Sequence, residues 1–336
     1  MSAQANLAGL YPPVTPEDTW NADIPWQPIP VHTAPETDDI ILAMKTNCPR
    51  YNYFMSQLME EPYFQDLAKH NQPIYQYVTK NTGRKVSDIL SLEFIYNTLF
   101  IEDLYNYTLP QWTKQVYPDV MRPLAALSFA IPCYNADLAR LKVGPLLNDI
   151  YTRLKASAAP PTENIYHPRG NAPYIESHSK QDQPKKMWMY SAHDTTVANV
   201  LNALRVFDPH SPPYTSAVII ELRTSIARGT FVNIFYKNSS VATPITLPTC
   251  TFDCSLEAFH GILAPLMVSP SDWYVECEQL SLLSLLAFES IEGIVFFVLC
   301  VFILMIVTML IYCIYCAKPN CEQRTYLRLP DDDQTV

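Results

Sequence analysis

Glycine is scarce in this sequence: the chain has 7 glycines against 29 prolines in 336 residues. Neither a Gly-x-Gly-x-x-Gly run nor a Gly-x-x-x-x-Gly-Lys-Ser/Thr run occurs. Both kinds of phosphate-binding loop need glycine where the backbone approaches the phosphates closely. The sequence therefore argues against nucleotide-binding enzymes of these two types.

Basic side chains are also few. The chain carries 23 Lys and Arg residues against 33 Asp and Glu residues, which gives a formal net charge of −10. A nucleic-acid-binding domain needs a basic patch or stripe, so no nucleic-acid partner is expected. At 336 residues the chain is long enough for one large domain or two modest ones.

A third absence is local: residues 293–317 contain no charged side chain. As a helix this stretch would be roughly 37 Å long, enough to cross a hydrocarbon core of about 30 Å with some tilt. The alternative is a buried core helix, but core helices rarely stay uncharged beyond about 14 residues. We predict a transmembrane helix here.

Charges on either side of this stretch predict its orientation. Glu289 and Glu292 precede it, and basic residues follow it at Lys318, Arg324 and Arg328. Because cytoplasmic flanks are enriched in Lys and Arg, we expect a single-pass type I protein whose residues 1–290 lie in a lumen or outside the cell. The start, MSAQANLAGLYPP, has neither the basic n-region nor the apolar h-region of a secretory leader. The predicted topology thus implies a leader that the sequence does not contain.

A lumenal location would set the chemistry of the cysteines. Disulfides are the default in an oxidising compartment for the cysteines before the span, Cys48, Cys133, Cys250, Cys254 and Cys277. Cys250 and Cys254 with His260 would otherwise suggest half of a metal site, but no second cysteine pair lies nearby, so no metal is expected. Two sequons predict glycosylation at Asn106 and Asn238.

Hydrophobic periodicity divides the lumenal part. Residues 1–34 are rich in proline and tryptophan and are predicted to be irregular. Residues 36–155 show the spacing of helices, with Pro145 expected in a first helical turn. Residues 187–192 predict a buried strand that is followed by a helix with Asp or Thr at its N-cap. Further strand-like runs span 217–222 and 231–236.

His193 and Asp194 lie between the predicted strand and the predicted helix. Ligands of open α/β sheets sit beyond the carboxyl ends of strands, and the N-terminus of a helix favours an anion. A histidine and an aspartate at this point could bind phosphate and act as a general acid. The alternative is that the pair only caps the helix.

The string Met189-Tyr190-Ser191-Ala192-His193-Asp194-Thr195-Thr196 resembles the second signature of the histidine acid phosphatases, the prostatic and lysosomal type. Other segments match the same family in the same order: Asn6-Leu7-Ala8 with Pro12-Pro13, Trp26 to Thr33, Asn47 to Arg50, Asn106 to Pro110, Pro212 to Tyr214 and Leu247 to Cys254. The resemblance covers residues 1 to about 278. The anchor and short tail are similar to those of the lysosomal members.

The resemblance implies a phosphoglycerate-mutase-like α/β sheet domain with a helical cap domain. It also implies hydrolysis of phosphomonoesters through a phosphohistidine intermediate, without a metal or another cofactor. In this family a histidine in an Arg-His-Gly-x-Arg motif attacks phosphorus, and arginines hold the phosphate oxygens. By resemblance, His193 would bind phosphate and Asp194 would protonate the leaving alcohol.

The nucleophile motif of that family is missing here, because none of the eleven arginines is followed by histidine. We interpret the chain as N-terminally truncated, without leader, first strand, nucleophile and arginine clamps, and expect residues 1–336 alone to be inactive. The alternative is a genuine short isoform, a non-catalytic single-pass glycoprotein with a degenerate phosphate pocket. The transcript upstream of Met1 distinguishes the two.

The resemblance also implies a disulfide framework. The family pairs the equivalents of Cys48 with Cys277 and of Cys250 with Cys254. Cys133 is then left unpaired.

These inferences divide the chain into six parts. They are a remnant of the α/β domain (1–35), a helical cap domain (36–155), an α/β domain with the His-Asp pair (156–278), a juxtamembrane stalk (279–292), the transmembrane helix (293–317) and a cytoplasmic tail (318–336). In the tail, Tyr326 and Leu329 match a Tyr-x-x-apolar pattern that a sorting adaptor would bind in extended form. We expect the protein in lysosomes, endosomes or the plasma membrane, and homodimerisation stays open.

Overall fold

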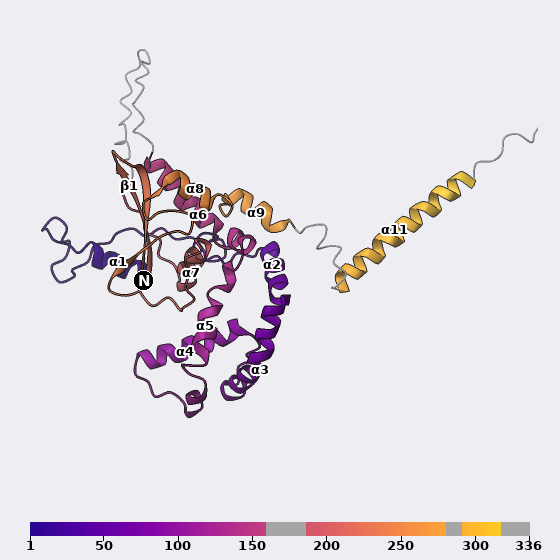
Figure 1. Ribbon diagram of the computed structural model, residues 1–336, viewed down its shortest axis with the longest axis horizontal. Helices are drawn as coiled ribbons and strands as arrows, with labels where there is room; N and C mark the ends of the chain where they lie inside the picture. Colours follow the sequence, from indigo (N-terminus) through magenta and orange to yellow (C-terminus); the bar gives the residue numbers. More distant parts are fainter. Residues whose placement is uncertain (159–185, 280–290, 317–336) are drawn as a thin grey trace, which may run out of the picture. The chain divides into compact units, whose positions relative to one another are not determined.

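The computed structural model describes residues 1–158, 186–279 and 291–316 (Figure 1). The chain forms two compact units, Met1–Gln279 and Leu280–Val336. The first unit combines helices with a small antiparallel sheet, which confirms the α/β fold class expected from the sequence.

The N-terminal half of the first unit is mainly helical. Its elements are α1 (Ser2–Leu10), α2 (Pro49–Glu60), α3 (Pro62–Thr82), α4 (Ile89–Leu104), η1 (Gln111–Gln115), α5 (Met121–Ser128), η2 (Ile131–Cys133) and α6 (Ala136–Ala158). The helical prediction for residues 36–155 is therefore confirmed. The prediction that residues 1–34 are irregular is wrong for α1, where alanine, leucine and glutamine favour a helix.

Local sequence explains where several of these helices begin and end. At the start of α4, Asp88 Oδ1 accepts the Ser91 N–H at 2.7 Å, and Ser91 Oγ accepts the Asp88 N–H at 3.1 Å. This reciprocal capping box satisfies two N–H groups that the helix leaves free. α3 ends at Gly83, whose φ of 72° is a left-handed conformation that costs glycine nothing.

A helical core is built from side chains of α2, α3, α4 and α5, the helices in the lower part of the first unit in Figure 1. Its most buried side chains are Leu58, Val78, Leu92, Met121, Ile131 and Leu138. Full burial of each such side chain contributes roughly 1.5–3 kcal/mol. This core holds the helical layer together.

α6 is the long helix that joins the helical layer to the sheet. Pro145 lies inside it rather than in a first turn, because the helix already begins at Ala136. Next to it, Gly144 allows a close approach: a Cβ there would lie 2.4 Å from the carbonyl oxygen of Leu266. The loop at Leu266 therefore packs directly on the helix backbone.

The sheet is antiparallel, with β2 (Gly229–Lys237) in the middle of β1 (Ala217–Ser225), β3 (Ala242–Ile245) and the two-residue β4 (Cys254–Ser255). The β1–β2 hairpin pairs Ala217 with Lys237 and Ser225 with Gly229. The two strands predicted at 217–222 and 231–236 are thus confirmed, and each is longer than predicted.

A second core lies between this sheet and its helices. It joins residues of β2 and α6 to α7 (Asp194–Ala203) and α8 (Leu256–Leu263), and its most buried members include Val143, Leu147, Leu204, Val232, Ile234, Phe259 and Leu263. α8 packs against β2 and β4, and α7 packs against β1 (Figure 1). α9 (Pro270–Glu278) then closes the unit, with Ser269 accepting the N–H of Asp272 at its start.

The buried strand predicted at residues 187–192 is not formed. The segment has no regular secondary structure, and Met187, Trp188 and Met189 are 52%, 42% and 38% exposed. A strand needs a neighbour for its backbone hydrogen bonds, and no strand of the described residues pairs with this segment. The apolar pattern alone therefore did not produce a strand.

In the second unit the described residues form one helix, α11 (Ile291–Cys316). Within it, Val295–Cys313 is long and apolar enough to cross a membrane, with a mean hydropathy of 3.0 and no part buried in the protein. At about 1.5 Å per residue, these 19 residues span roughly 28 Å.

Candidate active site

His193 and Asp194 both lie exposed at the start of α7. His193 is the N-cap and Asp194 the first helical residue, so the prediction of Asp or Thr at the N-cap is wrong by one position. The His193 N–H donates to Thr196 Oγ1 at 3.4 Å, and the Thr196 hydroxyl donates to the Leu42 carbonyl at 3.0 Å. Thr196 therefore fixes the start of the helix against the segment at Leu42.

Asp194 has one occupied and one open carboxylate oxygen. Oδ1 accepts the N–H of Thr195 at 2.7 Å, whereas Oδ2 has no hydrogen-bond partner among the residues that the structure describes. The first turn of α7 also presents backbone N–H groups and the positive end of the helix dipole. A free carboxyl oxygen beside an anion-favouring helix end is suited to proton donation near a bound phosphate.

The segment that leads into His193 is anchored on α6. The Tyr190 O–H donates to Asp149 Oδ2 at 2.5 Å, and Arg153 Nε donates to the same oxygen at 2.7 Å. The Arg153 guanidinium also lies 3.7 Å from the centroid of the Trp188 ring. This group of four side chains limits the movement of the segment although it lacks strand pairing. No local pattern in the sequence indicates this group, because only the fold brings α6 beside residues 188–190.

The charges of the His-Asp pair act on two further carboxyl groups. The hydrogen bond and charge of Lys45 lower the pKa of Glu36, and His193 adds a smaller effect in the same direction. Burial raises the pKa of Glu93 to about 7, and the charge of Asp194 contributes to that rise. Glu93, on α4, is a residue that sequence reasoning missed, because nothing in its local pattern points to the site.

The surroundings of the pair are therefore acidic. Lys45 is engaged with Glu36, Asp194 carries a carboxylate, and Glu93 adds negative charge once the pH rises above its pKa of about 7. A phosphate dianion needs several cationic or N–H donors. Among these neighbours the imidazole of His193 and the first turn of α7 are the groups that attract it.

The cysteines form two bonds and one buried thiol in the first unit. The structure pairs Cys48 with Cys277 and Cys250 with Cys254, the pairs that the family resemblance implies. Cys133 is free and fully buried, and burial raises the pKa of its thiol. Since both sulfurs of Cys250 and Cys254 are bonded to each other, neither is a free metal ligand. The described residues contain no group of three or more His, Cys, Asp and Glu that could hold a metal ion.

Both sequon asparagines are exposed on loops. Asn106 follows α4 with a φ of 60°, and its N–H donates to the Asp103 carbonyl at 2.9 Å. Asn238 lies in the turn between β2 and β3. Tyr326 and Leu329 lie outside the described residues.

This arrangement of a helical layer, a sheet and an exposed His-Asp pair at a helix start is accompanied by a family match. The family model of the histidine phosphatase superfamily (branch 2) matches residues 1–237, which include the pair and most of the sheet. The chain belongs to this superfamily, and the family predicted from the sequence strings is confirmed.

Its relatives are acid phosphatases. The chain is 33% identical over 285 residues to prostatic acid phosphatase of Bos taurus, covering 82% of this chain and 67% of the relative. It is 30% identical over 289 residues to lysosomal acid phosphatase of Xenopus laevis and 32% identical over 290 residues to that of Homo sapiens. Each of these two matches covers 84% of this chain and 62% of the relative. The chain thus spans about two thirds of the length of the relatives it matches.

Proposed function

We propose that residues 1–279 form the phosphate-binding and proton-donating part of an acid phosphatase site that acts on phosphomonoesters. His193 contacts the phosphate, and Asp194 protonates the leaving alcohol. The observation that carries the proposal is the position of the pair, exposed at the N-terminus of α7 with an open Asp194 oxygen. The phosphatase relatives and the family-like string around the pair support it.

We infer that residues 1–336 by themselves do not hydrolyse phosphomonoesters. None of the eleven arginines is followed by histidine, so the residues contain no candidate for the nucleophile motif. The cation described beside the pair, Lys45, is paired with Glu36, so it offers no phosphate clamp. Positioning and charge stabilisation supply most of the rate in phosphoryl transfer.

An activity assay tests this inference. The full chain, purified in nanodiscs, is incubated at acidic pH with a chromogenic phosphate ester, alongside a variant carrying His193→Ala and Asp194→Asn. Equal background rates for the two proteins are expected. A wild-type rate clearly above that of the variant would contradict the inference.

A chimera tests the roles of the pair directly. A segment with an Arg-His-Gly-x-Arg motif, taken from an acid phosphatase relative, is fused ahead of Met1. We expect phosphatase activity, and we expect Asp194→Asn to lower kcat for esters with poor leaving groups far more than for good ones, because only the former need protonation. The matched control is Asp208→Asn, an exposed aspartate after α7. A folded but inactive chimera would instead favour the non-catalytic glycoprotein.

We further propose that α11 anchors the protein in a membrane of the lysosomal or endosomal system. Its length, its hydropathy and its exposed apolar side chains support this, as do the lysosomal relatives. The first unit then lies in the lumen, with glycans on Asn106 and Asn238. Removal of N-linked glycans should shift the mobility of the wild type, and Asn106→Gln with Asn238→Gln should abolish the shift.

The tail would supply the sorting signal. Residues 318–336 are grafted onto a plasma-membrane reporter, and we expect internalisation that Tyr326→Ala abolishes. Thr325→Ala, at the neighbouring position, is the matched control and should leave uptake unchanged. A reporter that stays on the cell surface with the wild-type tail would remove the support for adaptor binding.

A further inference from the structure

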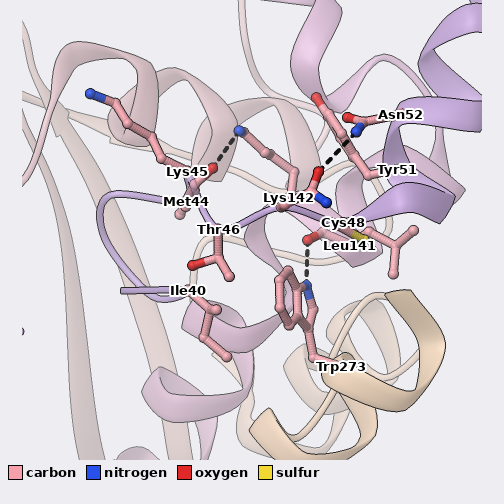
Figure 2. Close-up of a pocket in the computed structure, with 11 residues that line it drawn as sticks. Ile40, Met44, Lys45, Thr46, Cys48, Tyr51, Asn52, Leu141, Lys142 and Trp273 are labelled. Carbon is pink, nitrogen blue, oxygen red and sulfur yellow. Dashed lines mark hydrogen bonds between the residues drawn. The ribbon is translucent and has the colours of Figure 1, made fainter. Parts of the chain in front are cut away.

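A pocket of about 260 Å³ opens beside α6 and the start of α2 (Figure 2). Its wall is formed by Ile40, by residues 44–48, by Tyr51 and Asn52, by Leu141 and Lys142 of α6, and by Trp273 of α9. The lining contains neither His193 nor Asp194, and it includes no Asp or Glu. The pocket is therefore distinct from the His-Asp pair, and Lys45 is the lining residue that also pairs with Glu36 near that site.

The polar part of this pocket is cationic. Lys142 is half-buried, and its Nζ donates to the Met44 carbonyl at 2.7 Å and lies 5.2 Å from the centroid of the Tyr51 ring. An ammonium has three donors, and no carboxylate among the described residues pairs with this one. Burial lowers the pKa of Lys142, and the charge of Lys45, a second lining lysine, acts in the same direction. Two ammonium groups thus line the pocket without a carboxylate in the lining, and the partner of Lys45, Glu36, lies outside it.

An amide donor completes the polar part. Asn52 Nδ2 donates to Asn47 Oδ1 at 3.2 Å, which leaves Asn47 Nδ2 without a partner among the residues described. Lys45 is paired with Glu36, and both side chains are largely exposed, so this ion pair lies towards the solvent. Figure 2 shows Lys142, Asn52 and Tyr51 on one side of the pocket.

The other part of the pocket is apolar. Trp273 is buried, and its Nε1–H is used by the Leu141 carbonyl at 2.7 Å, so the indole offers only apolar surface to the pocket. Ile40 lies nearby and is also buried (Figure 2). Inorganic phosphate would leave this surface uncovered, and the lining lacks the arginine fork that commonly holds phosphate.

We propose that this pocket binds a small organic monocarboxylate. The carboxylate accepts hydrogen bonds from Lys142 Nζ and Asn47 Nδ2, with Lys45 adding positive charge, and the aliphatic body packs on Trp273 and Ile40. The volume lies slightly below the ~300–1,000 Å³ of pockets for drug-sized ligands, so a chain of a few carbons fits.

Calorimetric titration of the full chain in nanodiscs tests the proposal with butyrate as the probe. Wild type should bind butyrate, and Lys142→Met should weaken binding at least tenfold. Lys155→Met, which removes an exposed charge from the same helix, should bind like wild type. Lys45→Met, at an exposed position that does not threaten folding, should weaken binding about threefold or more.

Two further probes separate charge from apolar contact. 1-Butanol should bind far more weakly than butyrate. Inorganic phosphate should not displace bound butyrate. The proposal is overturned if wild type does not bind butyrate, if Lys142→Met binds it equally well, or if phosphate competes. If circular dichroism shows that Lys142→Met is unfolded, the Lys45→Met titration decides instead. An unchanged butyrate affinity of Lys45→Met would overturn the proposal.

Discussion

Glu93 and Asp194 illustrate how single residues shape the candidate site. Burial raises the pKa of Glu93 to about 7, and the charge of Asp194 adds to the rise. In an acidic compartment Glu93 is therefore protonated and adds no negative charge beside Asp194. At neutral pH it ionises and would repel a phosphate. The local charge thus favours anion binding under acidic conditions.

Replacing Glu93 should change how stability depends on pH. The folded pKa of about 7 lies above the ordinary value of 4.5, so the folded state binds the proton more tightly and loses stability as pH rises from about 4.5 to 7. Glu93→Gln removes this loss. Because the side chain is only half-buried, we expect a gain of about 1 kcal/mol at pH 7.5 and none at pH 4.5.

Urea unfolding of the full chain at the two pH values measures this difference. Glu278→Gln, at an exposed position at the end of α9, is the control and should show no gain that depends on pH. An equal effect of Glu93→Gln at both pH values would contradict the assigned cause.

Some residues of the candidate site could be predicted from the sequence, and others could not. His193 and Asp194 stand in a family-like string, so their place at a helix start could be predicted. The Tyr190–Asp149 hydrogen bond joins residues 41 positions apart, and the charge of Asp194 acts on Glu93, which lies on another helix. Such pairs follow from tertiary packing, which no local pattern encodes.

Among the secondary-structure elements, α6 shows how tightly neighbouring segments are fitted. Gly144 faces the Leu266 carbonyl and Val268 Cγ1, at 2.4 and 2.9 Å from where a Cβ would lie. Alanine has the higher helix propensity, by about 1 kcal/mol, but here its methyl group would push against backbone. The steric cost outweighs the propensity.

Gly144→Ala should therefore lower the free energy of unfolding by about 1–3 kcal/mol, the range for overpacked sites. Gly261, in α8, has nothing within 4 Å of the position that a Cβ would take, so Gly261→Ala should raise stability by up to about 1 kcal/mol. Chemical denaturation of both variants measures whether each substitution lowers or raises the free energy of unfolding. A gain in stability for Gly144→Ala would show that the loop at Leu266 moves away easily.

Elements differ in how far their own residues specify them. The helices of residues 36–155 and the strands at 217–222 and 231–236 follow from periodicity, because each buries a continuous apolar face. The run at 187–192 has the pattern of a strand but no pairing partner among the described strands. A strand is specified jointly with its neighbour, so pattern alone was insufficient.

For the molecule as a whole, the covalent frame joins distant parts of the first unit. Cys48 precedes α2 and Cys277 lies near the end of α9, at a sequence separation of 229. Beside this bond, Arg140 donates two hydrogen bonds to Glu276, at 2.9 and 2.6 Å, and two more to the carbonyls of Pro265 and Met267. The end of the unit is thus fastened to α6 and α2 at once.

Loss of the two disulfides should have unequal effects. By the chain-entropy model the long loop is worth about 5 kcal/mol and the short one, with a separation of 4, about 2 kcal/mol. Cys48→Ser with Cys277→Ser should therefore destabilise the chain more than Cys250→Ser with Cys254→Ser. Thermal unfolding of the two double variants ranks them. The reverse order would mean that native contacts, rather than loop entropy, dominate.

If α11 anchors the chain in a membrane, as proposed above, the position of Cys277 has a mechanical consequence. Tension that enters from the membrane side reaches Cys277 two residues before Gln279, and the sulfurs pass it directly to Cys48. A pull between the anchor and the N-terminal segment therefore bypasses the polypeptide between these cysteines. Both hydrophobic cores lie almost entirely within that shielded stretch. Under the proposed anchoring, such a pull would load the disulfide and residues 1–48 and leave the chain between the two cysteines outside the direct path of the force.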